Sequence, residues 1–216
     1  MTEQTATLDP LFHPATMKDF MTSDSQTPLS RASLLAAILL LAGVFFRVIR
    51  VDLAPETLPN FSPLMAAALC GAVFIPGWLG LVVPVVALLI SDAMLNAHYG
   101  VPMISGQLAW TLPCYLIAVG IGGLLRSRDA GLWPVLGGTL LSSVIFFVVT
   151  NTGSWLGLAA YPQNFSGWVQ ALTTGLPGYP PTWTFFRNSL AGDLLFAAFF
   201  VAVERSLATR KAVAIA

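Results

Sequence analysis

Six apolar runs constrain the fold of this chain more than any other feature of its sequence. They cover residues 32–49, 63–75, 78–95, 103–125, 133–150 and 183–203. A helix needs about 20 apolar residues to cross the hydrocarbon core of a bilayer, where a spanning segment must satisfy its own backbone hydrogen bonds. Since 56% of the 216 residues are hydrophobic and only 9% are charged, we predict an all-α membrane protein with a six-transmembrane-helix bundle.

The second run differs from the others because it is short. We expect it to lie away from the lipid boundary or to start from a re-entrant loop around residues 60–63. Pro76 and Gly77 then predict the turn into the third run.

The ends of the chain are polar. Residues 1–30 are rich in Thr, Ser and Asp and contain Pro10, Pro14 and Pro28, which predicts a disordered tail. We therefore divide the chain into this tail, a transmembrane domain at 31–206 and a short basic tail at 207–216. No cleavable signal peptide is expected, because the first apolar run follows a long polar segment and is followed by arginines.

The basic residues predict the orientation. Loops on the cytoplasmic side collect Lys and Arg near the ends of spanning helices. With six crossings and the amino terminus inside, seven basic residues are cytoplasmic and three are not, so both termini are predicted to be cytoplasmic. The seven are Lys18, Arg31, Arg126, Arg128, Arg205, Arg210 and Lys211, and the three are Arg47, Arg50 and Arg187.

Polar side chains inside the apolar runs are the first candidates for function. A charged group in the membrane costs about 2.5–3.5 kcal/mol, so it persists where it pairs, lines a wet cavity or holds a ligand. Counting the helical rise from each helix end places one set of polar residues in the outer third of the membrane. This set is Asn60, Asp92, Gln107, Asn151, Arg187 and Asn188, with Asp193 deeper, near the middle of the membrane.

These positions predict a substrate-binding site that opens outward. Arg187 would hold an anionic group or else pair with Asp92, the four amides would supply hydrogen bonds, and Asp193 would orient a cation or an amine. The alternative is purely structural. In that interpretation Arg187 extends to the headgroups, the two aspartates pair within the bundle, and Asn60 caps the second helix.

The outer segment between the fifth and sixth runs contains no charged residue and many aromatic ones. Its middle, 166–173, is predicted to form a short helix with Trp168, Val169 and Leu172 on one face. Two interpretations remain open: an aromatic belt on the outer membrane surface, or a lid over an outward-facing pocket.

Four short motifs resemble those of an uncharacterised bacterial family of six-helix membrane proteins, related to the substrate-binding S components of energy-coupling-factor transporters. The resemblance covers residues 34–203 approximately. The motifs are Asn60-Phe61-Ser62-Pro63, Leu89-Ile90-Ser91-Asp92, Thr150-Asn151 and Phe186-Arg187-Asn188-Ser189-Leu190-Ala191-Gly192-Asp193.

The resemblance implies a location in the bacterial inner membrane and a small-molecule ligand taken from the outer side. It also implies membrane scaffold and ATPase subunits as partners, since S components carry no ATPase. The scaffold contacts small residues four apart in the first helix, which Ala32 and Ala36 match. Small residues at this spacing are common in membrane helices.

Other functions lack their sequence signals. The net charge of +0 gives no nucleic-acid footprint, and no phosphate-binding loop for ATP is present. Neither histidine has a partner at metal-ligand spacing, so no metal and no cofactor are expected. Asp92 and Asp193 lack the flanking residues of an intramembrane aspartyl protease, and no enzymatic activity is predicted.

The sequence therefore favours a small-solute-binding membrane protein. The competing class is a non-transporting accessory subunit of a larger membrane complex, in which the same polar residues only stiffen the bundle. A large outward cavity distinguishes the two, because only a binding protein needs one.

Overall fold

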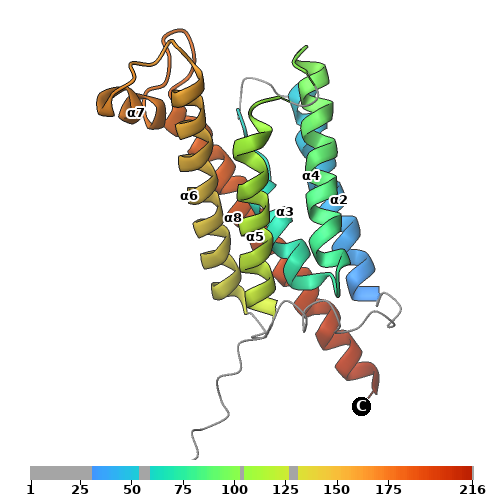
Figure 1. Ribbon diagram of the computed structural model, residues 1–216. Helices are drawn as coiled ribbons and strands as arrows, with labels where there is room; N and C mark the ends of the chain where they lie inside the picture. The colour runs from blue at the N-terminus through green and yellow to red at the C-terminus, as the bar shows by residue number, and fades with distance from the viewer. Residues whose placement is uncertain (1–30, 54–58, 103–104, 127–130, 216) are drawn as a thin grey trace, which may run out of the picture.

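The structure is a computed structural model that describes residues 31–53, 59–102, 105–126 and 131–215. This described part is all-helical apart from loops and turns (Figure 1), which confirms that the fold is all-α, while the count of six spanning helices and the orientation of the termini stay predictions. Its helices are α2 (Arg31–Leu53), α3 (Leu64–Phe74), α4 (Leu79–His98), α5 (Leu108–Arg126), α6 (Leu132–Gly157), α7 (Phe165–Leu172) and α8 (Thr182–Ile215). The predicted tail at 1–30 lies outside the described residues.

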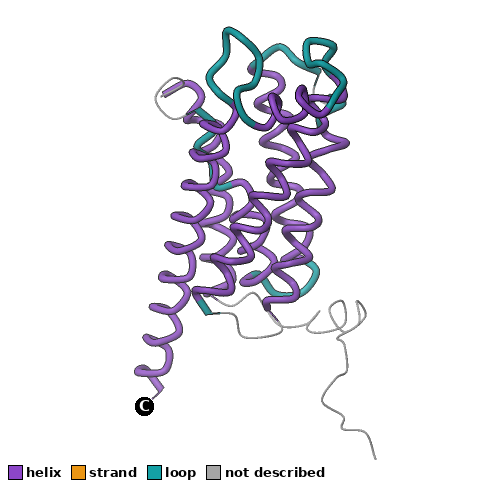
Figure 2. The backbone as a smooth tube through the Cα atoms, turned by 90° about the vertical axis from the view of Figure 1, so that its left-hand side faces the viewer, coloured by secondary structure: helices purple, strands orange, loops and turns teal. Residues whose placement is uncertain are grey.

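Four of these helices are long and apolar enough to cross a membrane: α4, α5, α6 and the part of α8 from Thr182 to Ser206. Large apolar side chains cover their outer surface, including Trp133 at 79% and Leu195 at 65% exposure. A soluble domain rarely exposes so wide an apolar surface. The chain is therefore an all-α membrane protein. Figure 2 shows that α8 also continues past the ends of the other helices, because its backbone remains helical to Ile215.

The short helix α3 forms the core of one half of the bundle. Its residues 64–73 are all buried, and it packs against every other long helix. Small residues allow this close packing: a Cβ at Gly122 of α5 would lie 2.5 Å from the carbonyl oxygen of Leu69. The prediction that the second apolar run lies away from lipid is confirmed.

Charged side chains from other helices complement both ends of α3. No side chain from Pro63 caps its first turn. Instead, the Asp193 carboxylate of α8 accepts hydrogen bonds from the backbone N–H groups of Met65 (2.9 Å) and Ala66 (3.0 Å). At the other end, Arg126 of α5 donates to the carbonyl of Ile75. An anion at the N-terminus and a cation at the C-terminus both stabilise the helix dipole.

Residues 59–63 enter α3 as a non-helical segment, as predicted for the start of the second run. Helix α8 contacts this segment along one turn. The Asn188 side chain donates to the carbonyl of Pro59 at 3.0 Å, and a Cβ at Gly192 would lie 3.1–3.2 Å from the backbone of Ser62. Non-helical backbone is tolerated at membrane depth where protein surrounds it, and α8 supplies that surrounding.

The short helix predicted for 166–173 is confirmed as α7, displaced by one residue. Asn164 caps it by accepting from the backbone N–H of Gly167 at 2.9 Å. The Trp168 indole N–H donates to the hydroxyl of Thr152 at 2.9 Å, which fixes α7 to the end of α6. In Figure 1, α7 lies at the side of α6 that faces away from α2 and α4.

Candidate functional site

A cavity of about 590 Å³ occupies the half of the bundle that α3 leaves unfilled. Its walls come from α2, α4, α5, α6 and α8, from Asn60 of the non-helical segment, and from Ser105 and Gln107 just before α5. It lies where α4 and α6 end and where α5 and α8 begin, so it is close to the loops at that end of the bundle (Figure 1).

An ion pair lies in the wall formed by α2 and α4. Arg47 Nη1 is 2.5 Å from Asp92 Oδ1 and donates to Ser91 Oγ at 2.7 Å. The Tyr115 hydroxyl donates to the second carboxylate oxygen of Asp92 at 2.8 Å. The two charged side chains are only 16% and 17% exposed. Each charge therefore has an internal partner, which is what makes ionised groups tolerable at membrane depth.

The hydroxyl groups of the cavity donate mainly to their own helices. Thr150 Oγ1 donates to the carbonyl of Phe146 at 2.7 Å, and Ser154 Oγ donates to that of Thr150 at 3.1 Å. Asn151 donates its amide N–H to the carbonyl of Phe147 at 2.8 Å. A hydroxyl whose proton is used in this way retains its oxygen lone pairs as acceptors. These α6 side chains consequently offer acceptors to whatever enters the cavity.

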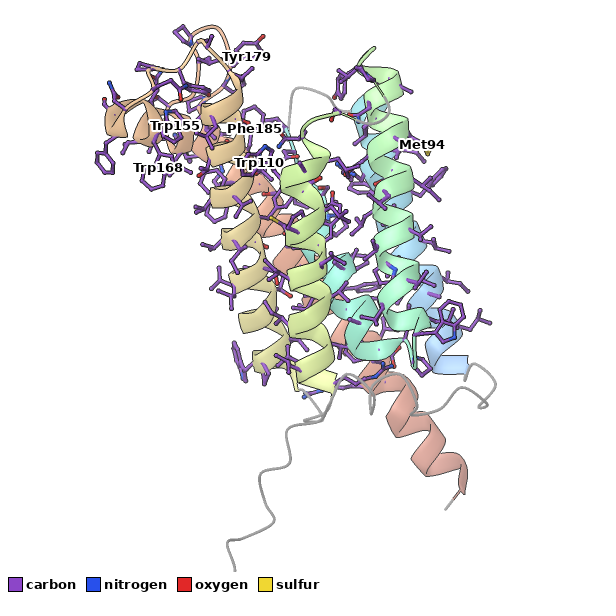
Figure 3. All side chains as sticks on the ribbon, viewed as in Figure 1. Met94, Trp110, Trp155, Trp168, Tyr179 and Phe185 are labelled. Carbon is purple, nitrogen blue, oxygen red and sulfur yellow. The ribbon has the colours of Figure 1, made fainter. Side chains whose placement is uncertain are left out.

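Aromatic rings form the wall opposite the ion pair. Phe146, Phe147, Phe185 and Phe186 of α6 and α8 line the cavity. The rings of Phe147 and Phe186 stack with centroids 4.5 Å apart, and Phe146 is parallel to Tyr115 at 6.2 Å. Figure 3 places Phe185 at this end of the bundle, beside α6. The cavity thus combines a charged wall with an aromatic one, as small-molecule sites commonly combine apolar surface with a few placed polar groups.

Of the seven predicted substrate-binding residues, four line this cavity: Asn60, Asp92, Gln107 and Asn151. They come from separate segments of the chain. The depth in the membrane, estimated by counting residues from the helix ends, had placed them at a similar level. The residue that sequence reasoning missed is Arg47, which had no role assigned. Its position at the outer end of the first apolar run was the available signal, since the run ends at the same depth as Asp92.

The predicted pair between Arg187 and Asp92 is wrong. Arg187 lies at the exposed surface of α8, with its guanidinium 5.2 Å from the ring centroid of Trp183. It donates to the side-chain oxygen of Asn188 at 3.3 Å and does not line the cavity. The estimate of depth did not determine which face of α8 carries the arginine, and Asp92 pairs with Arg47 instead.

Asn188 and Asp193 do not line the cavity. Their side chains form hydrogen bonds with backbone groups of residues 59–66. Asp193 is 1% exposed, and Ser143 Oγ lies 2.7 Å from its second oxygen. The expected role of Asp193 in orienting a cation or amine is replaced by its contact with the first turn of α3. A residue count along one helix cannot reveal this partner, because the donors are backbone groups of a distant segment.

The outer segment at 151–182, for which an aromatic belt and a lid were both open interpretations, borders the cavity only at its two ends. Asn151, Ser154 and Thr182 line the cavity, whereas no lining residue comes from 158–181, a stretch that the structure describes throughout. Ala36, expected to contact a partner helix, is fully buried in the protein's own core. It is therefore not presented to another subunit. The side chain of Ala32 lies outside the described residues.

The fold and the cavity define an all-α membrane protein with a partly polar internal cavity near one end of its bundle. The chain belongs to the family of unknown function DUF6580, whose model matches residues 26–214. Comparison with curated proteins and with solved structures gave no match. Among the described residues, no group of three or more His, Cys, Asp or Glu side chains is placed to hold a metal ion.

Proposed function

We propose that this protein binds a small solute in the cavity and presents it for transport, in the manner of the S components that its motifs resemble. The observation that carries the proposal is the cavity itself. Its volume of about 590 Å³ lies within the roughly 300–1,000 Å³ of ligand pockets. An accessory subunit that only stiffens a complex does not need such a cavity, so the cavity disfavours that alternative.

The proposed topology has six crossings with both termini in the cytoplasm of a bacterial cell and the cavity open to the outer side of the inner membrane. Helix α3 alone is too short to cross, with 11 residues. In the proposed topology, the non-helical residues 59–63 and α3 together make the second crossing, with α3 supplying its helical part.

In this proposal the protein is a binding subunit and not an enzyme. With no phosphate-binding loop in its sequence, it depends on membrane scaffold and ATPase subunits for energy. Ala36, which was expected to face a partner, packs inward and therefore does not belong to the partner-facing surface.

Untargeted mass spectrometry of molecules that co-purify with the protein tests the binding function. Ala93 of α4 lines the cavity, whereas Ala109 of α5 is exposed outside it. We expect wild type and Ala109→Trp to retain the same small molecule and Ala93→Trp to lose it, because only the indole at 93 fills the cavity. If the three proteins carry identical small molecules, the cavity is not the binding site.

Labelling of introduced cysteines tests the topology. Tyr179 is 73% exposed in the loop before α8, and Ser206 is exposed at the far end of the apolar part of α8. Both native cysteines are buried, which keeps the background low. A membrane-impermeant reagent should label Tyr179→Cys in intact cells and Ser206→Cys only after lysis. The reverse pattern would place the cavity on the cytoplasmic side.

A further inference from the structure

Two positively charged groups that the structure describes lie at the cavity or next to it: the Arg47 guanidinium and the N-terminus of α3. A carboxylate of the protein itself neutralises each of them. The Arg47 guanidinium pairs with Asp92 at 2.5 Å. The N-terminus of α3, where an anion would otherwise be favoured, already carries Asp193 on the N–H groups of Met65 and Ala66. An anionic solute therefore finds no uncompensated cation among these groups.

The carboxylates of Asp92 and Asp193 are likewise already paired within the protein. Both oxygens of Asp92 are engaged, one by Arg47 and the other by the Tyr115 hydroxyl. Asp193 is 1% exposed and does not line the cavity. Arg187, the other arginine near this end whose side chain the structure describes, projects to the exposed surface beside Trp183. A cationic solute would thus have to compete with Arg47 for Asp92.

The two walls of the cavity differ in chemistry. The α2–α4 wall presents a guanidinium donor directly beside a carboxylate acceptor. The α6–α8 wall presents the rings of Phe146, Phe147, Phe185 and Phe186. Aromatic rings pack favourably against other flat rings in offset or edge arrangements.

We infer that the solute is net neutral, with a planar ring that packs on the phenylalanine wall and an edge carrying both hydrogen-bond donors and acceptors that meets the Arg47–Asp92 pair. This inference rests on the proposed binding function and specifies its ligand. Transferring a net charge from water into a cavity without a free counter-charge is unfavourable. A neutral, amide-like edge instead can accept a hydrogen bond from Arg47 and donate one to Asp92 at the same time. The amide side chains of Asn60, Gln107 and Asn151 add further groups of both kinds.

The test identifies by mass spectrometry the molecule that wild type retains and Ala93→Trp loses, and assigns its charge at pH 7 and its ring content. A neutral or zwitterionic molecule with a planar ring supports the inference. A molecule with a net charge, or one without a ring, overturns the inference while leaving the binding function intact. If no molecule distinguishes wild type from Ala93→Trp, the binding function fails and the inference with it.

Two variants of the pair separate charge from hydrogen bonding. Asp92→Asn leaves the Arg47 guanidinium uncompensated, and we expect retention of the molecule to fall at least about tenfold, equivalent to about 1.4 kcal/mol. The double variant Arg47→Gln/Asp92→Asn keeps donors and acceptors while removing both charges, so it should regain most of the retention. If the double variant retains less than Asp92→Asn, the solute depends on the Arg47 charge, and the inference of a neutral ligand is wrong.

Discussion

The two halves of the helix bundle are built from the same long helices but hold very different interiors. In one half, α3 fills the centre with buried Ala, Leu, Met and Val side chains. In the other half, the non-helical residues 59–63 take the place of a helix and leave the cavity of about 590 Å³. The length of the short helix α3 therefore determines which half of the bundle has a packed core and which half contains the cavity.

Two aspartates show the same contrast at the level of side chains. Asp193 belongs to the filled half and contacts two backbone N–H groups and a serine, with 1% exposure. Asp92 belongs to the cavity and contacts an arginine and a tyrosine, with its side chain 17% exposed. The first stabilises the fold, and the second faces the space where we propose that the solute binds.

The largest effect is expected from Asp193→Ala. Removing the carboxylate leaves the N–H groups of Met65 and Ala66 buried without acceptors, at about 1–3 kcal/mol each. We expect the free energy of unfolding to fall by about 2–6 kcal/mol, the sum for the two groups, measured by thermal unfolding in detergent followed by circular dichroism. Asp193→Asn keeps one carbonyl oxygen and should lose less. Wild-type melting of Asp193→Ala would mean that the first turn of α3 does not depend on α8.

The ion pair of the cavity should contribute less to stability. Arg47→Ala is expected to cost about 2 kcal/mol, because the pair is largely but not fully removed from solvent. In a double-mutant cycle, Arg47→Ala and Asp92→Asn should show a coupling of about 1–2 kcal/mol. Arg187→Ala combined with Asp92→Asn should be additive within about 0.5 kcal/mol. Coupling of Asp92 to Arg187 instead would contradict the described pairing.

A glycine pair tests how closely α8 approaches the non-helical segment. Gly192→Ala places a Cβ 3.1–3.2 Å from the backbone of Ser62, and we expect a loss of about 1–2 kcal/mol from the crowding. At Gly120 of α5, a Cβ meets no atom within 4 Å. Gly120→Ala should therefore be neutral or stabilise by up to about 1 kcal/mol. Equal effects at the two positions in a thermal-unfolding series would show that the approach at Gly192 is not tight.

The smallest effect on stability is expected from Asn60→Gly, because Asn60 has a positive φ of 61°. Asn60→Gly accepts this conformation and should change the free energy of unfolding by less than about 0.5 kcal/mol. Asn60→Ala must adopt a left-handed conformation and should cost about 1–2 kcal/mol. Because Asn60 lines the cavity, both variants should retain less solute. Full retention in Asn60→Gly would remove Asn60 from the binding site.

The apolar runs predicted the helices well because the cost of unpaired backbone in lipid leaves few alternatives. The short second run and the prolyl segment before it correctly predicted the buried α3 with its non-helical entry. Depth along a helix was also informative, since it grouped Asn60, Asp92, Gln107 and Asn151, which all line the cavity.

The partners of individual charges were not predictable in the same way. Depth fixes the level of Arg187 but not the face of α8 on which it lies, and pairing requires both. The partners of Asp193 are backbone N–H groups, which no residue type in the sequence marks. Arg47 was visible at the end of the first run, but only the packing of α2 against α4 brings it to Asp92.

The contact between α3 and α8 also has a consequence for the order in which the helices insert and pack. Asp193 and Met65 are 128 positions apart, and α8 is synthesised after α3, α4, α5, α6 and α7. Until α8 enters the membrane, the first turn of α3 lacks its acceptor, and an unpaired N–H group is unfavourable in lipid. We therefore expect the second apolar run to complete its packing only after α8 has inserted, so that a nascent chain ending before α8 still lacks the acceptor for the first turn of α3.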